Sequence, residues 1–325
     1  MKIKKNHFYI GVLAVVIILS AAAFYFVKSI NEAKKIEEKP QNDWLVDSNG
    51  YLSYPLERGD VKFSRQDYGA DGSLTIHKII YQSRGGNIYG FLVLPTSAEK
   101  LLPGVVLLPG AGVSKESELE LAKKIASLDA AVLVIDQRGV GETTANANSI
   151  ERDYIDFFNG KEPSQHLMVY DALRAYDLME TAPFTDSGRI MMAGESLGGR
   201  IAVIAAAIDR NIGGVLVISS AGLGVEMTNN TKVNSFLNSI DSDHYIELIT
   251  PRKIVMMHNA NDKNILLGAA LESYSKAQEP KQFVLVNDTA CNHGYCDSMY
   301  NGLVDALDYL VGIKSKTLVS VPSGS

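Results

Sequence analysis

Residues 190–200 read IMMAGESLGGR, an apolar run that breaks into a serine flanked by glycines. Gly194, Ser196 and Gly198 match the pattern G-x-S-x-G, in which a sharp strand-to-helix turn exposes a nucleophilic serine at the edge of a sheet. Glycine suits such a turn because it tolerates backbone angles and close contacts that a Cβ would forbid. A structural glycine-rich turn without chemistry matches the same letters, so the rest of the chain must decide between the two interpretations.

The sequence around this stretch alternates between β-rich runs and helical patterns. A hairpin is predicted over 74–94, with its turn at residues 84–87. Strands then follow at 104–110, 131–139, 189–193, 214–219, 253–258 and 282–286, and helices at 115–128, 164–181, within 195–208 after the serine turn, at 265–277 and at about 298–311. The strands are unbroken Val, Ile and Leu runs, which is typical of strands covered on both faces. The pattern predicts an α/β fold: a mostly parallel sheet opened by an antiparallel hairpin, with helices on both faces.

Composition excludes one class of partner. The chain has 325 residues and a formal net charge of −6, so it offers no basic surface for nucleic acid. We expect four segments: a membrane anchor at 1–28, a linker and extension at 29–73, the folded domain at 74–312 and a tail at 313–325.

The N-terminal segment contains an uncharged apolar stretch, residues 8–27. About 20 helical residues span a bilayer, so a single-pass anchor is predicted. Residues 21–23 read AAA and also match a signal-peptidase site, which leaves a cleaved leader as the alternative. Lysines flank the stretch on both sides, and we expect the N-terminus inside and the folded domain outside the cell membrane.

Two further residues complete a catalytic constellation with Ser196. Ligand sites in such sheets lie beyond the carboxyl ends of the strands. Asp262 follows the strand 253–258, and His293 follows the strand 282–286. The chain order Ser, Asp, His is that of α/β-hydrolases among the known triads. Asp262 also fits a helix N-cap. The weaker alternatives are Asp288 and Asp243 for the acid, and His258 and His166 for the base.

The pieces LLPGAG, DQRGVGET, GESLGG, HNANDKN and NHGYC resemble the α/β-hydrolase superfamily, and within it the esterase and acyl-peptidase-like branches. The resemblance covers about 74–311. It implies that Ser196 attacks a carbonyl, His293 is general base and then acid, and Asp262 orients the imidazole. It also implies an oxyanion hole from the backbone N–H groups of Leu197 and Ala111. Pro109 stands where the family often has histidine, which places the Ala111 donor in doubt.

The resemblance implies a small-molecule ester as substrate, with thioesters or acylated peptides as alternatives, and neither a cofactor nor a metal. Peptide hydrolysis is a weaker alternative. A hypothesis of another class is a non-catalytic binding module on the same fold, because fold alone does not establish function.

Cys291 and Cys296 are the chain's two cysteines, and they bracket His293. In an extracytoplasmic domain they are predicted to form a short disulfide that holds the histidine turn. A zinc site and free thiols are the alternatives. Glu195 is interpreted as a charge stabilised at a helix N-terminus. The segments 140–163 and 219–251 are expected to act as a short lid and to wall an acyl pocket, with Tyr154, Phe157 and Phe158 contributing.

Overall fold

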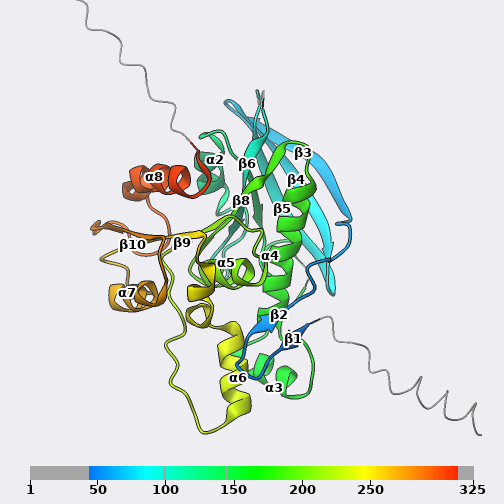
Figure 1. Ribbon diagram of the computed structural model, residues 1–325. Helices are drawn as coiled ribbons and strands as arrows, with labels where there is room; N and C mark the ends of the chain where they lie inside the picture. The colour runs from blue at the N-terminus through cyan, green and yellow to red at the C-terminus, as the bar shows by residue number, and fades with distance from the viewer. Residues whose placement is uncertain (1–43, 98–99, 144, 314–325) are drawn as a thin grey trace, which may run out of the picture. The chain divides into compact units, whose positions relative to one another are not determined.

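A nine-stranded β-sheet runs through the residues that the computed structural model describes, which are 44–97, 100–143 and 145–313 (Figure 1). The strand order is β11-β10-β9-β8-β6-β7-β5-β4-β3. The strands are β3 (Phe63–Asp71), β4 (Leu74–Ser83), β5 (Gly86–Pro95), β6 (Leu102–Leu108), β7 (Ala131–Ile135), β8 (Thr185–Glu195), β9 (Gly214–Ile218), β10 (Lys253–Asn259) and β11 (Lys281–Val286). Neighbouring strands pair antiparallel from β3 through β4 and β5 to β7. From β7 onward they pair parallel, in the order β7, β6, β8, β9, β10 and β11. The mostly parallel sheet that the sequence predicts is confirmed.

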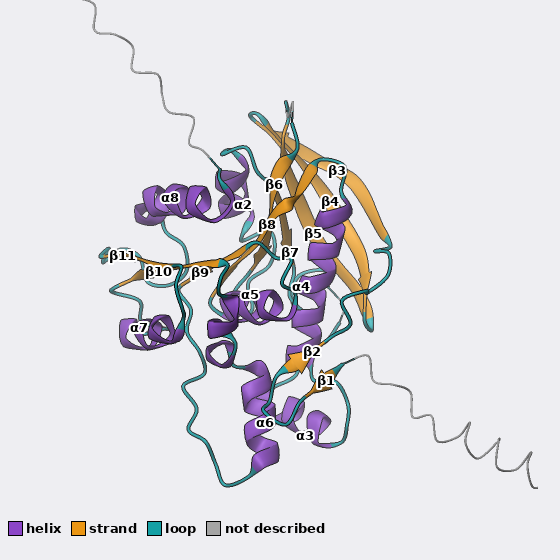
Figure 2. Ribbon diagram, in the orientation of Figure 1, coloured by secondary structure: helices purple, strands orange, loops and turns teal. Residues whose placement is uncertain are grey.

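Helices cover both faces of the sheet (Figure 2). Helices α2 (Leu119–Ala126) and α8 (Tyr300–Val311) pack on one face. Helices α4 (Ser164–Thr181) and α5 (Leu197–Ile208) pack on the other, where α7 (Leu267–Lys276) also contacts β10. Successive side chains of a strand point to opposite sides of the sheet, so an unbroken apolar run makes both faces apolar. In β6, Val106 and Leu108 join one core cluster and Val105 and Leu107 the other.

The folded part begins earlier than residue 74. Strand β3 extends the hairpin of β4 and β5 into three antiparallel strands, with Phe63 opposite Tyr81 and Asp71 opposite Leu74. Before it, β1 (Leu45–Val46) and β2 (Leu52–Ser53) form a separate two-stranded ribbon. Sequence analysis missed β3 because its side chains are exposed throughout, so it carries no apolar run.

Two further helices lie where loops were expected. Helix α3 (Ile150–Phe158) begins after Ser149, whose side chain accepts a hydrogen bond from the N–H of Arg152. Helix α6 (Thr231–Ile240) begins after Asn230, which caps it in the same way. Short 3-10 helices at Ser242–His244 and Ile246–Ile249 follow α6, and another lies at Asp297–Met299.

None of the helices in the described ranges has the length and hydropathy that a bilayer crossing requires. The predicted anchor, residues 8–27, lies outside those ranges, as does the predicted tail beyond residue 313.

The turn between β8 and α5 packs closely against the backbone of β6. A Cβ on Gly198 would lie 2.0 Å from the carbonyl oxygen of Leu108 in β6, and one on Gly194 would lie 2.4 Å from the backbone of Gly198. Contacts with backbone atoms cannot be relieved by a side-chain rotation. The two glycines of the G-x-S-x-G pattern are therefore required by close packing of α5 on the sheet.

We expect Gly198→Ala to lower the free energy of unfolding by about 1–3 kcal/mol, because the methyl group overlaps the β6 backbone. Urea unfolding of the full-length protein measures this. The matched control is Gly268→Ala in α7, where an added Cβ meets no atom within 4 Å. That variant should be as stable as the parent or slightly more stable, because alanine favours helix. Equal stabilities for the two variants would contradict the packing argument.

Candidate active site

Ser196 lies in the turn between β8 and α5 with backbone angles φ 49° and ψ −115°. A positive φ is uncommon for a residue with a side chain and persists only when the surroundings impose it. Here the N–H of Ser196 donates to the carbonyl of Ile218, at 3.0 Å, and its carbonyl accepts from the hydroxyl of Ser220, at 2.6 Å. This strained geometry is that of a nucleophile elbow.

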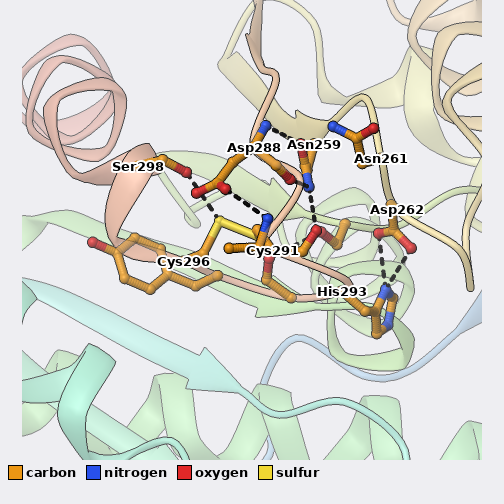
Figure 3. The surroundings of a disulfide bond; sticks show 12 residues. Asn259, Asn261, Asp262, Asp288, Cys291, His293, Cys296 and Ser298 are labelled. Atoms are coloured by element: carbon orange, nitrogen blue, oxygen red, sulfur yellow. Dashed lines mark hydrogen bonds and ion pairs between the residues drawn. A yellow bond between two sulfur atoms is a disulfide. The ribbon is translucent and has the colours of Figure 1, made fainter.

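Asp262 and His293 lie together at the same edge of the sheet, just beyond the parallel neighbours β10 and β11 (Figure 3). Nδ1 of His293 lies 2.9 Å from Oδ2 and 3.1 Å from Oδ1 of Asp262. The side chain of Asp262 is fully buried. The carboxylate therefore fixes the orientation of the imidazole ring.

Burial raises the pKa of Asp262, but hydrogen bonds to the carboxylate outweigh it and hold the pKa below its ordinary value. Oδ1 accepts the backbone N–H groups of Asn264 and Ile265, both at 2.9 Å, in addition to the contact with His293. The residue thus makes cap-like bonds before α7 and also contacts the histidine. Asp262 is not the N-cap residue of α7, which is Leu266; its contact with His293 is the one that the proposed catalytic role requires.

Ser196 and His293 face one cavity of 760 Å³. Its lining includes Gly110, Ala111, Ser196, Asn264, His293 and Tyr295. No hydrogen bond joins the Ser196 hydroxyl to His293 in the described part of the chain. Such contacts are often long without substrate and shorten in the reactive complex.

The predicted oxyanion donors flank Ser196. Leu197 is the first residue of α5, and Ala111 lies in the loop after β6 and lines the cavity. That loop is close to the serine, because a Cβ on Gly110 would lie 3.5 Å from Cβ of Ser196. Pro109 stands where the family often has histidine, and the loop nevertheless lies next to Ser196.

Sequence analysis missed the residues that hold this loop. The side-chain amide of Gln137 donates to the carbonyl of Pro109 at 3.0 Å. Asp136, fully buried, accepts the backbone N–H of Lys115 at 2.7 Å and its ammonium at 2.9 Å. Both belong to the DQRG stretch directly after β7, the strand next to β6, and this position was the available signal.

The other candidates for acid and base are engaged elsewhere. His258 Nε2 contacts the carbonyl of Ile265, and burial lowers its pKa. His166 Nε2 contacts the hydroxyl of Ser239. Asp243 pairs with Lys276, and a carboxylate oxygen of Asp288 accepts the N–H of Ala290.

A disulfide joins Cys291 and Cys296, with their Cα atoms 6.0 Å apart (Figure 3). With both sulfurs bonded to each other, the zinc alternative has no thiolate ligands. The side-chain amide of Asn259 donates to the carbonyls of Asp288 and Cys291, which ties this loop to the end of β10. His293 is held inside a short closed loop.

The expected walls of the pocket are wrong. Within the described residues, neither 140–163 nor 219–251 lines the cavity that contains Ser196. Tyr154 and Phe157 instead pack on Phe236 of α6, with ring centroids 5.7 and 5.5 Å apart. The cavity is walled by the loop after β6, α2, the turn at Ser196, Asn264 and residues 293–297.

The structure also gives Glu195 a contact that the sequence interpretation did not include. Its Oε1 accepts the backbone N–H of Tyr295 at 2.9 Å, so its main contact is with the histidine loop. Glu118, just before α2, lines the same cavity and was not identified from the sequence.

Comparison with known proteins finds a matching family model and solved structures with the same fold. Residues 55–224 match the family model described as acetyl xylan esterase (AXE1). The acetyl xylan esterase from Paenibacillus sp. R4 aligns with a TM-score of 0.64 at 20% identity, over 77% of this chain and 88% of that one. Acetyl xylan esterase 1 from Thermoanaerobacterium sp. JW/SL YS485 also has a TM-score of 0.64, at 15% identity over 78% and 89% of the chains.

A curated relative, the uncharacterized protein YfhR of Escherichia coli O157:H7, is 27% identical over 177 residues. The match covers 50% of this chain and 62% of the relative, less than two thirds of its length. The family model spans more than half of the 325 residues. The chain therefore belongs to the acetyl xylan esterase (AXE1) family of α/β-hydrolases.

Proposed function

We propose that this protein is a serine esterase that works through an acyl-enzyme, with Ser196 as nucleophile, His293 as base and Asp262 as the acid that orients it. The observation that carries the proposal is that His293, hydrogen-bonded to the buried Asp262, faces the same cavity as the strained Ser196. A serine hydroxyl needs such a base, because it is a poor nucleophile at neutral pH.

In this mechanism Ser196 Oγ attacks the ester carbonyl while Nε2 of His293 takes its proton. The oxyanion that forms is stabilised by the N–H groups of Leu197 and Ala111, each donor contributing about 3 kcal/mol. The imidazolium then protonates the leaving alcohol. Water, activated by the same histidine, attacks the acyl-serine and releases the acid.

We propose esters of short acids with polar alcohols, such as acetylated carbohydrates, as the substrate class. The family to which the chain belongs supports this choice. The cavity supports it too, because polar side chains of Glu118, Lys124 and Asn264 line it beside the nucleophile. Thioesters, acylated peptides and peptides are less favoured.

Replacing Ser196 with alanine is expected to abolish labelling by a fluorophosphonate probe and to lower kcat/KM for an acetyl ester by at least about 10⁴-fold. His293→Ala should do the same. Asp262→Asn should lower kcat on the order of 10⁴-fold, because the amide favours the wrong imidazole tautomer. Labelling and hydrolysis of p-nitrophenyl esters of increasing acyl length by the full-length protein measure this.

The matched control is Ser275→Ala, an exposed serine on α7, which should leave labelling intact. A folded parent that neither labels nor hydrolyses any ester would sink the esterase proposal and favour the non-catalytic binding module. Preference for long acyl chains over acetyl would contradict the substrate class alone.

We also propose that residues 8–27 anchor the enzyme in the cell membrane, with the hydrolase domain outside. The uncharged length of the stretch and the basic leader before it support this. A disulfide beside the histidine fits an oxidising compartment.

Protease added to intact cells that express the full-length chain is expected to digest the hydrolase domain, since this orientation exposes it. Permeabilised cells are the control for protease access. Protection in intact cells and digestion only after permeabilisation would reverse the orientation. Domain found free in the medium would instead support a cleaved leader.

A further inference from the structure

Two carboxyl groups lie side by side next to the candidate nucleophile. Glu195 immediately precedes Ser196, and Glu118 immediately precedes α2 without making a side-chain capping bond; both line the cavity that contains Ser196 and His293. Glu118 is only 5% exposed. The two carboxyl groups are close enough to hydrogen-bond to each other when one of them is protonated. The mechanism proposed above assigns no function to Glu118 or Glu195.

Glu195 contacts the two residues that follow His293 in the chain. Its Oε1 accepts the N–H of Tyr295, and a Cβ on Gly294 would lie 2.6 Å from its Oε2. Gly294 has φ +80°, a conformation that favours glycine. The carbonyl of Gly294 accepts the hydroxyl of Ser219 at 3.2 Å. Glu195 is thus packed against the two residues that follow His293.

The pair lacks a cation. In the described ranges, no lysine or arginine forms an ion pair with Glu118 or Glu195. The other ionisable groups lining the cavity are Glu120, Lys124, His293, Tyr295 and Asp297. Lys124 pairs with Asp297 at 3.0 Å, and Glu120 pairs with Lys123. Glu118 is buried and Glu195 is half-buried. Two carboxylates in contact and shielded from water repel each other, which favours a pair that retains one proton.

We propose that Glu118 and Glu195 are positioning residues that share one proton, the Glu195 carboxylate holding the His293 loop through Tyr295 while protonated Glu118 donates to Glu195. The proposal rests on the esterase function proposed above, because it assigns the pair a role through His293.

The electrostatics agree with this arrangement. Burial, the charge of Glu195 and the hydrogen bond to it raise the pKa of Glu118 to about 8. Burial also raises the pKa of Glu195, opposed by the Tyr295 N–H, the charge of His293 and the hydrogen bond from Glu118. Glu118 therefore holds the shared proton at neutral pH.

The sign of the pH dependence follows. Glu118 binds its proton more tightly in the folded than in the unfolded protein, so its contribution to stability is present at low pH and lost as pH rises through its folded pKa. Above about pH 8 the second negative charge repels Glu195 from its place on the histidine loop. Stability and activity should both fall there.

Glu118→Gln tests this, because an amide donates to Glu195 but does not titrate. In the full-length parent, kcat/KM for p-nitrophenyl acetate should decline above about pH 8, and in the variant this decline should shift upward by about one pH unit or more. Between pH 6 and 9 the Tm of the variant should fall by about 2–4 °C less than that of the parent. The control is Glu272→Gln, an exposed helical glutamate paired with Lys276, which should follow the parent.

Glu195 is tested by two variants. Glu195→Ala removes the acceptor for Tyr295 and should lower kcat about 10- to 100-fold with little change in KM, because the base is misplaced. Glu195→Gln keeps an acceptor oxygen and should recover most of that loss at neutral pH. Equal losses for both variants would overturn the positioning role.

Identical pH profiles and identical Tm profiles for the parent and Glu118→Gln would overturn the shared proton. The Tm measurement needs no activity, so it also tests the pair if the parent hydrolyses no ester. In that case the esterase proposal fails while the carboxyl pair is judged on stability alone.

Discussion

Helix α5 can lie against strand β6 only because residue 198 has no side chain, and the whole site depends on that approach. The Leu108 carbonyl occupies the space that a Cβ would need. This contact draws the turn at Ser196 down onto the sheet and forces its positive φ. It also brings Gly110, in the loop after β6, so near Ser196 that an added Cβ would be in van der Waals contact with the serine side chain. One close contact thus places both Ser196, the proposed nucleophile, and the loop with the proposed oxyanion donor.

The histidine loop is held in a different way, since residues 291–296 belong to no strand. Its contacts come from side chains at the carboxyl ends of three strands: Glu195 at the end of β8, Ser219 after β9 and Asn259 in β10. The disulfide closes the loop on itself. The strands that carry Ser196 and Asp262 therefore also set the position of His293, which couples all three residues to one rigid frame.

The sequence predicts the parallel strands and the order of Ser196, Asp262 and His293, because apolar runs and the polar residues that follow them are local features. It does not predict the cavity walls, since aromatic residues in a loop carry no sign of whether they face a pocket or, like Tyr154, another helix. The sequence does not predict strand β3 either, because its side chains are exposed and form no apolar run. The capping residues Ser149 and Asn230 were the available signals for α3 and α6.

The carboxyl pair is beyond sequence analysis for a stronger reason. Glu118 and Glu195 are far apart in the chain, and each alone suits a helix N-terminus. Only their contact creates a buried charge without a cation.

That contact also limits the charge around the histidine. Asp262 is an ionised carboxylate held by backbone N–H groups, and its low pKa keeps it ionised throughout the neutral range. In the arrangement that we propose, Glu118 and Glu195 share one proton and together contribute a single further negative charge. A further carboxylate charge at the same place would repel both of them. The shared proton that we propose would let Glu195 hold the loop with a charged oxygen while the pair adds only one negative charge beside His293.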